Sequence, residues 1–142
     1  MWGILIAVLS GALMSVQGVF NTEVTKQTSL WVSSAFVQFT ALLVTLGIWL
    51  VTDRTSLTAL GLVQHKYMLL SGVIGAFITI TVVQGMNQLG PARAAMLIVI
   101  AQLIVAYLIE LFGLFGVKQQ PLEWKKEIGM VIAIVGIIIF KW

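Results

Sequence analysis

The chain has 142 residues, of which 60% are apolar and 9% are charged, and it contains no cysteine. Average soluble domains are about 45–50% apolar and about 25% charged, so this composition excludes an ordinary soluble enzyme and predicts that lipid surrounds most of the chain. The formal charge of +3 comes from scattered basic residues rather than from a stripe or cluster, which argues against a nucleic-acid partner.

Five apolar runs are long enough, or nearly so, to cross a bilayer as helices. A spanning helix needs about 20 mostly apolar residues. The predicted spans are residues 2–20, 30–51, 67–86, 92–112 and 122–142. The last run is uninterrupted only over residues 128–140, and it reaches back to Leu122 if Lys125 and Lys126 extend toward the headgroups. The sequence therefore predicts an all-α integral membrane protein in which residues 1–142 form a single transmembrane domain.

The segments between the runs are short. Residues 21–29 and 88–91 are expected to be tight links, whereas residues 52–66 have room for a short interfacial helix around residues 57–63. Pro91 follows Gly90 and suits the first turn of the fourth helix. The first run has no basic residue before it and no cleavage pattern of small residues after it, so we expect it to be a span rather than a signal peptide.

Uncharged polar residues recur at helical spacing inside four of the runs. Because unpaired polar groups are costly in hydrocarbon, such residues face other helices or a wet cavity. The first run carries Ser10, Met14, Gln17 and Asn21 at such spacing, and the second carries Ser34, Gln38, Ala41 and Thr45. The third has Thr81, Gln84 and Gln88, and the fourth has Gln102, Ala106 and Glu110. Either these residues only hold helices together, or they line a cavity; taken together, they favour a cavity.

Glu110 is the one carboxylate that falls within a run and could be buried in the membrane. If the fourth helix ends near Phe112, Glu110 lies at the interface. If the helix continues through Phe115, Glu110 lies within about 8 Å of the helix middle, where a carboxyl could exchange a proton for a cation. Both alternatives remain open on the sequence.

Small residues mark the expected packing faces. The first run repeats Gly3, Ala7, Gly11 and Ser15 every four residues and adds Gly18, a spacing that lets helix backbones approach closely. The fifth run has a seam of Gly129, Ala133 and Gly136 and no polar face, which is typical of a scaffold or dimer helix.

Stretches in the first and fourth predicted spans resemble the YdcZ-like family of the drug/metabolite transporter superfamily. The stretch from Ser10 through Gln17 to Asn21 is similar to the family's first helix, and the stretches from Leu89 to Ala95 and from Glu110 to Leu114 are similar to its fourth. The resemblance implies a half-transporter of five spans. Two oppositely inserted copies would rebuild a ten-helix inverted-repeat transporter, with the solute bound near the midplane between them.

These observations predict a secondary active transporter of small organic solutes in the inner, cytoplasmic membrane, working as an exporter by alternating access. The expected solute-binding residues are Gln17, Asn21, Gln38, Gln84 and Gln102, and Glu110 is the expected site of proton or cation coupling. No catalytic residue, metal or cofactor is expected, because no nucleophile–base pair, metal cluster or phosphate loop is present in the sequence. The alternatives are a dual-topology small channel and a non-transporting scaffold or helper subunit.

An odd number of spans places the two termini on opposite sides of the membrane. The side of the N-terminus then carries five Lys and Arg residues and the other side carries three, a weak positive-inside bias. A weak bias permits both orientations, so we expect dual topology and an antiparallel homodimer.

Overall fold

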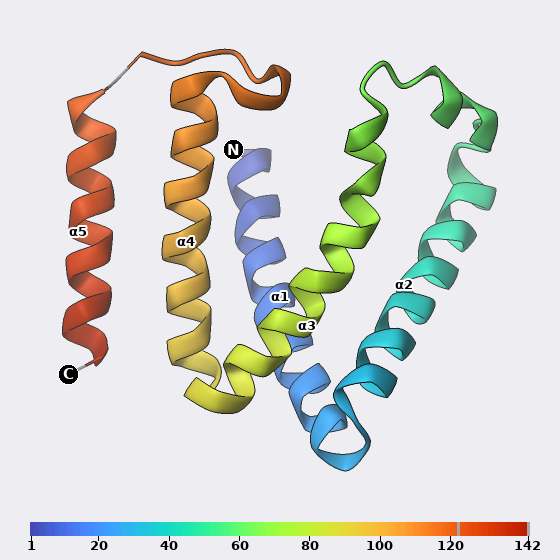
Figure 1. Cartoon of the computed structure of the whole chain (residues 1–142), viewed down its shortest axis with the longest axis horizontal. Helices are drawn as coiled ribbons and strands as arrows, with labels where there is room; N and C mark the ends of the chain where they lie inside the picture. Colours follow the sequence, from blue (N-terminus) through green and yellow to red (C-terminus); the bar gives the residue numbers. More distant parts are fainter. Residues whose placement is uncertain (122, 142) are drawn as a thin grey trace. The chain divides into compact units, whose positions relative to one another are not determined.

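The computed structural model describes residues 1–121 and 123–141, and every regular element in that part of the chain is helical (Figure 1). The helices, in chain order, are α1 (Trp2–Gln27), α2 (Leu30–Thr52), η1 (Leu57–Leu62), η2 (Lys66–Leu70), α3 (Ser71–Leu89), α4 (Pro91–Phe112), η3 (Leu114–Gly116) and α5 (Trp124–Lys141). They form two compact units, residues 1–88 and residues 89–142.

Four of the predicted spans correspond to helices that are long and apolar enough to cross a membrane. Among the described residues these are α1, α2, the segment Lys66–Leu89 and α4. The remaining α-helix, α5, carries three charged residues in its first turn, Lys125, Lys126 and Glu127, and is not among these four. Its crossing of the membrane stays a prediction, and Leu122 and Trp142, the two ends of that predicted span, lie outside the described residues.

Helix α1 is longer than the first apolar run. It continues to Gln27, so most of the expected link over residues 21–29 is helical and only Thr28 and Ser29 connect α1 to α2. Residues 19–27 contain no glycine or proline, and the side chains of Glu23 and Lys26 pair one turn apart at 2.6 Å, which supports the added helix. Asn21 therefore lies inside a helix rather than in a link.

In the first unit, α1, α2 and α3 are held together near the α1–α2 connection. The Ser29 side chain caps α2 by accepting a hydrogen bond from Val32 N at 3.2 Å. The fully buried Ser33 donates its hydroxyl to the backbone oxygen of Asn21 at 3.1 Å. From this point α1 and α2 separate toward their other ends (Figure 1). The packed part of this unit is thus confined to one end of the hairpin.

The crossing of α1 and α3 depends on a glycine. A Cβ atom placed on Gly18 would lie 2.6 Å from both Sδ and Cε of Met86, a side chain that is only 4% exposed. The other glycines of the predicted small-residue faces on α1 and α5, such as Gly3, Gly11 and Gly129, have no atom within 4 Å of that position. Close helix packing at a glycine therefore occurs at Gly18, and the other small-residue faces are open in the described chain.

The connection from α2 to α3 contains two short helices. The expected helix around residues 57–63 is present as the 3₁₀ helix η1, and its start is capped by the Ser56 hydroxyl, which accepts from Thr58 N at 3.3 Å. The Trp49 indole donates to the backbone oxygen of Thr55 at 3.0 Å and fixes the chain as it leaves α2.

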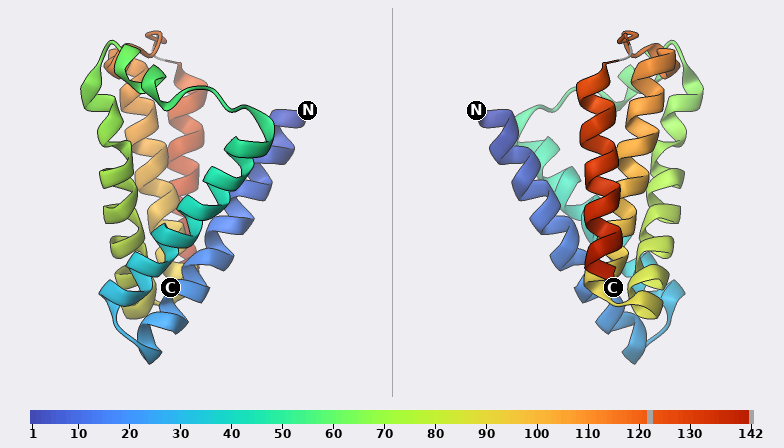
Figure 2. Two further views of the ribbon diagram at one scale, coloured as in Figure 1. Left: turned by 90° about the vertical axis from the view of Figure 1, so that its right-hand side faces the viewer. Right: turned by 90° about the vertical axis from the view of Figure 1, so that its left-hand side faces the viewer.

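The second unit is an antiparallel pair of helices, and Figures 1 and 2 both show α4 and α5 side by side. Pro91 begins α4, as predicted, after Gly90 with a φ of 82°. The helix ends at Phe112 because Gly113 adopts the left-handed conformation, with a φ of 61°. The carbonyl of Glu110 then accepts from Gln120 N at 3.0 Å, which folds the following segment back onto the helix end.

Candidate functional site

A groove between α1 and α2 collects most of the polar residues of the first predicted face. Its volume is about 720 Å³. Ser10, Met14, Gln17 and Asn21 all line it, so the spacing read from the sequence did place these side chains on one face. Its lining extends from Asn21 back to Ser10 on α1 and from Val37 to Thr45 on α2. This arrangement provides a concave surface with both polar and apolar walls.

Helix α2 contributes two hydroxyls to the groove, Thr40 and Thr45. The Thr40 hydroxyl lies 3.0 Å from the carbonyl oxygens of Phe36 and Val37, and the Thr45 hydroxyl lies 2.9 Å and 3.0 Å from those of Ala41 and Leu42. In each case the hydroxyl proton is donated to the backbone of the preceding turn. The oxygen lone pairs remain available as acceptors.

Gln38 does not join this groove. Its side-chain amide donates to the Thr79 hydroxyl of α3 at 3.2 Å and thereby bonds α2 to α3. Gln38 is half-buried, whereas Ser34, one turn earlier, is buried, and the Ser34 hydroxyl has no hydrogen-bond partner in the described part of the chain. The two groups are therefore placed in the packing of the first unit, and a contact of Gln38 with solute stays a prediction.

Gln84 and Gln102 are both exposed and neither lines the groove. Neither makes a side-chain hydrogen bond within residues 1–121 and 123–141. Gln84 belongs to the first unit and Gln102 to the second. Their role in solute binding stays a prediction. Both amides are free to contact another helix or a solute.

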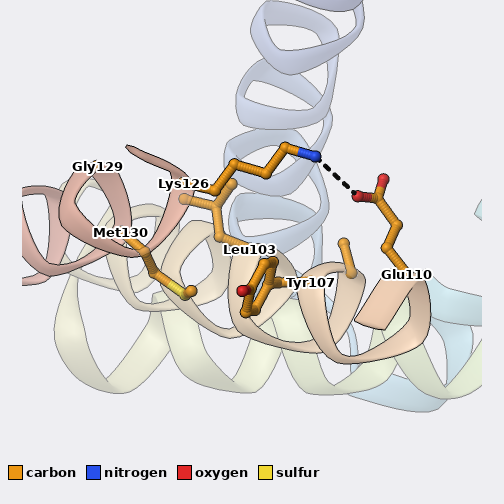
Figure 3. A pocket seen from close by; sticks show the side chains of 7 residues that line it. Leu103, Tyr107, Glu110, Lys126, Gly129 and Met130 are labelled. Carbon is orange, nitrogen blue, oxygen red and sulfur yellow. Dashed lines mark ion pairs between the residues drawn. The ribbon is translucent and has the colours of Figure 1, made fainter. Parts of the chain in front are cut away.

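Glu110 lines a second cavity, of about 360 Å³, between α4 and α5 (Figure 3). Its carboxylate lies 3.9 Å from the Lys126 ammonium of α5, which also lies 3.7 Å from the Glu123 carboxylate. The side chain of Glu110 is 47% exposed, and the helix that carries it ends two residues later. Of the two alternatives left open by the sequence, the structure shows the shorter helix. Coupling through Glu110 stays a prediction.

The α4–α5 cavity also contains residues that the sequence analysis did not single out. Tyr107 lies one turn before Glu110 and donates its hydroxyl to Glu127 of α5 at 3.2 Å. Tyr107 and Glu110 are three residues apart, a spacing that places two side chains on the same face of a helix. This spacing could have predicted that Tyr107 lies in the same cavity. Lys126 and Glu127, in the first turn of α5, contact α4. The apolar run of α5 did not predict these contacts. Among the described residues, no group of three or more His, Asp or Glu side chains could hold a metal ion.

Comparison with known protein families matches residues 2–139 to one family, described as "Putative inner membrane exporter, YdcZ". The chain belongs to the YdcZ family. It is therefore a multi-pass protein of the inner membrane and a member of an exporter family, and the family description points to transport rather than to catalysis. No curated protein and no solved structure matches the chain.

Proposed function

We propose that this chain exports small organic solutes across the inner membrane by alternating access, and that two oppositely inserted copies form the working transporter. The observation that carries the proposal is the groove between α1 and α2, whose lining includes Gln17, Asn21, Thr40 and Thr45, in a chain of an exporter family. Ligand sites in helical proteins typically combine apolar walls with a few polar groups of this kind.

The pairing of two copies is supported by surfaces that the described chain leaves uncovered. The glycines of α1 and α5 outside Gly18 have open space around them, and Gln84 and Gln102 are exposed amides on apolar helices. Exposed amides in hydrocarbon are costly unless another helix or a wet cavity meets them. A second copy in the opposite orientation would provide helices that contact these amides. This antiparallel pairing requires α5 to cross the membrane as well.

Proton coupling is the part of the proposal that concerns Glu110. Its carboxylate and the Lys126 ammonium form an ion pair between α4 and α5, so protonation of Glu110 would release Lys126 from that contact. Replacement by Glu110→Gln in liposomes with an imposed proton gradient tests this part separately. If the gradient stimulates transport equally in the variant, Glu110 is not the coupling residue.

Transport by purified protein in liposomes tests the proposal as a whole. We expect uptake of at least one class among cationic, anionic and neutral organic solutes, and loss of that uptake in Gln17→Leu. Gln27→Leu is the matched control, because Gln27 is an exposed residue at the end of the same helix and does not line the groove. Absence of uptake for all classes would support a scaffold, and discrete current steps in a planar bilayer would support a channel.

A further inference from the structure

We propose that the α1–α2 groove selects uncharged amphipathic solutes that donate hydrogen bonds, such as alcohols, over organic anions and quaternary ammonium cations. This inference rests on the proposed function, since it names the class of solute that the transporter would carry. It follows from three properties of the groove lining: its charge, its hydrogen-bonding groups and its apolar walls.

The first property is that no Lys, Arg, Asp or Glu side chain lines the groove. A solute with a full charge would give up hydration without gaining an ionic partner, and burying an unpaired charge is costly. The nearest carboxylate along α1 is Glu23, which pairs with Lys26 at 2.6 Å and is half exposed. The groove therefore disfavours fixed anions and fixed cations alike.

The second property is an excess of acceptors over donors. The protons of Thr40 and Thr45 are already donated to backbone carbonyls, so these two groups can offer only oxygen lone pairs to a solute. The Ser10 hydroxyl and the amides of Gln17 and Asn21 also line the groove, and each can both donate and accept, so these three groups create no opposing preference. A solute that carries an O–H or N–H group can therefore use two acceptor-only groups as well as these three, whereas an ether or ketone can use only the three groups that donate.

The third property is the apolar part of the lining. Leu13 and Phe20 of α1 and Val37 and Val44 of α2 provide most of the remaining wall. The volume of about 720 Å³ lies within the range of about 300–1,000 Å³ that is usual for pockets of drug-sized ligands. The solute therefore needs an apolar body as well as a donor group.

Four probes with the same apolar body separate these properties. They are 4-phenylbutan-1-ol, its methyl ether, 5-phenylpentanoate and 4-phenylbutyltrimethylammonium. Binding is measured by equilibrium dialysis against the protein in lipid nanodiscs, with empty nanodiscs as the blank for partitioning into lipid. We expect the alcohol to bind about tenfold more tightly than each of the other three, as the loss of one or two hydrogen bonds or the burial of a charge predicts.

The combined variant Thr40→Val and Thr45→Val removes both acceptors and keeps the branched shape of each side chain. We expect the alcohol to lose most of its advantage and to bind within about threefold of the ether. Thr52→Val is the matched control, because the Thr52 hydroxyl makes the same kind of bond, to the carbonyl of Ile48 at 2.7 Å, but lies outside the groove. This control should keep the full preference.

Binding and transport of the same probes distinguish failure of this inference from failure of the proposed function. Equal or tighter binding of the ether, the carboxylate or the ammonium compound overturns the inference, even if the protein transports them. Absence of binding by all four probes also overturns it. If the alcohol binds with the expected preference but is not transported, the solute class stands and the exporter function fails.

Discussion

At the scale of single residues, polar side chains with similar sequence spacing have different surroundings. Gln17 lies in an open groove, Gln38 donates to a hydroxyl on the next helix, and Gln84 is exposed on α3. All three are glutamines inside apolar runs. Their surroundings depend on where helices approach one another, so single substitutions can separate residues that pack helices from residues that contact a solute.

The contact between Gly18 and Met86 predicts a strong effect of added volume. Gly18→Val should lower the stability of the purified protein by about 1–3 kcal/mol, the usual cost of overpacking, because its Cβ would lie 2.6 Å from the Met86 side chain. Thermal unfolding in detergent measures the effect. Met86→Ala should relieve most of it, and Gly11→Val should change stability little, because Gly11 has open space around it. Equal losses at Gly11 and Gly18 would contradict the crossing of α1 and α3 at Gly18.

The hydrogen bond from Gln38 to Thr79 predicts coupling between α2 and α3. In a double-mutant cycle of Gln38→Leu and Thr79→Val, we expect a coupling energy of about 0.6 kcal/mol, with about 1.7 kcal/mol as the upper bound seen for bonds between membrane helices. The cycle uses the same unfolding measurement. Strictly additive losses would show that the two side chains do not interact.

At the scale of helices, the sequence was most informative about where apolar segments lie and least informative about where helices end. The runs predicted the positions of four helices, and Pro91 marked the start of α4. The end of α4 could not be derived, because it depends on Gly113 adopting a left-handed conformation instead of continuing the helix. The length of α1 was underestimated, because residues 21–27 are polar except for Val24 and yet are helical.

The end of α4 yields a prediction about Gly113. Gly113→Ala should lower stability by about 1–2 kcal/mol, since a φ of 61° is unfavourable for a residue with a Cβ and that atom would lie 3.2 Å from Cβ of Gln119. Gly136→Ala is the matched control within α5, where no atom lies within 4 Å and the helix is regular. Thermal unfolding should therefore separate the two variants. If Gly113→Ala is as stable as Gly136→Ala, α4 does not end at Gly113.

At the scale of the whole molecule, the sequence and its family establish an inner-membrane protein, while the placement of the functional side chains needed the structure. The polar face of α1 was predictable because all four residues lie on one helix at a regular spacing. The contribution of Thr40 to the groove was not predictable, because it depends on the angle at which α2 leaves α1. Likewise, the contacts of Lys126 and Glu127 with α4 depend on how the chain folds back after Gly113.

The antiparallel pair of copies predicts that molecules insert in both orientations. Reporters fused to the C-terminus should be found on both sides of the inner membrane, because the five-to-three distribution of Lys and Arg is nearly balanced. Adding two lysines to the 52–66 segment should shift most molecules to the orientation with that segment in the cytoplasm. A single orientation for every molecule of the unmodified chain would contradict the proposed homodimer.

The central claim, that the α1–α2 groove holds the transported solute, can be tested by cysteine protection. The chain has no cysteine, so each introduced thiol is unique. In transport-competent liposomes, a transported solute should slow maleimide labelling of Ala41→Cys and Val44→Cys, which line the groove, but not of Val8→Cys, which is exposed on α1 outside it. Unchanged labelling of both groove variants at solute concentrations that saturate transport would show that the solute takes another route.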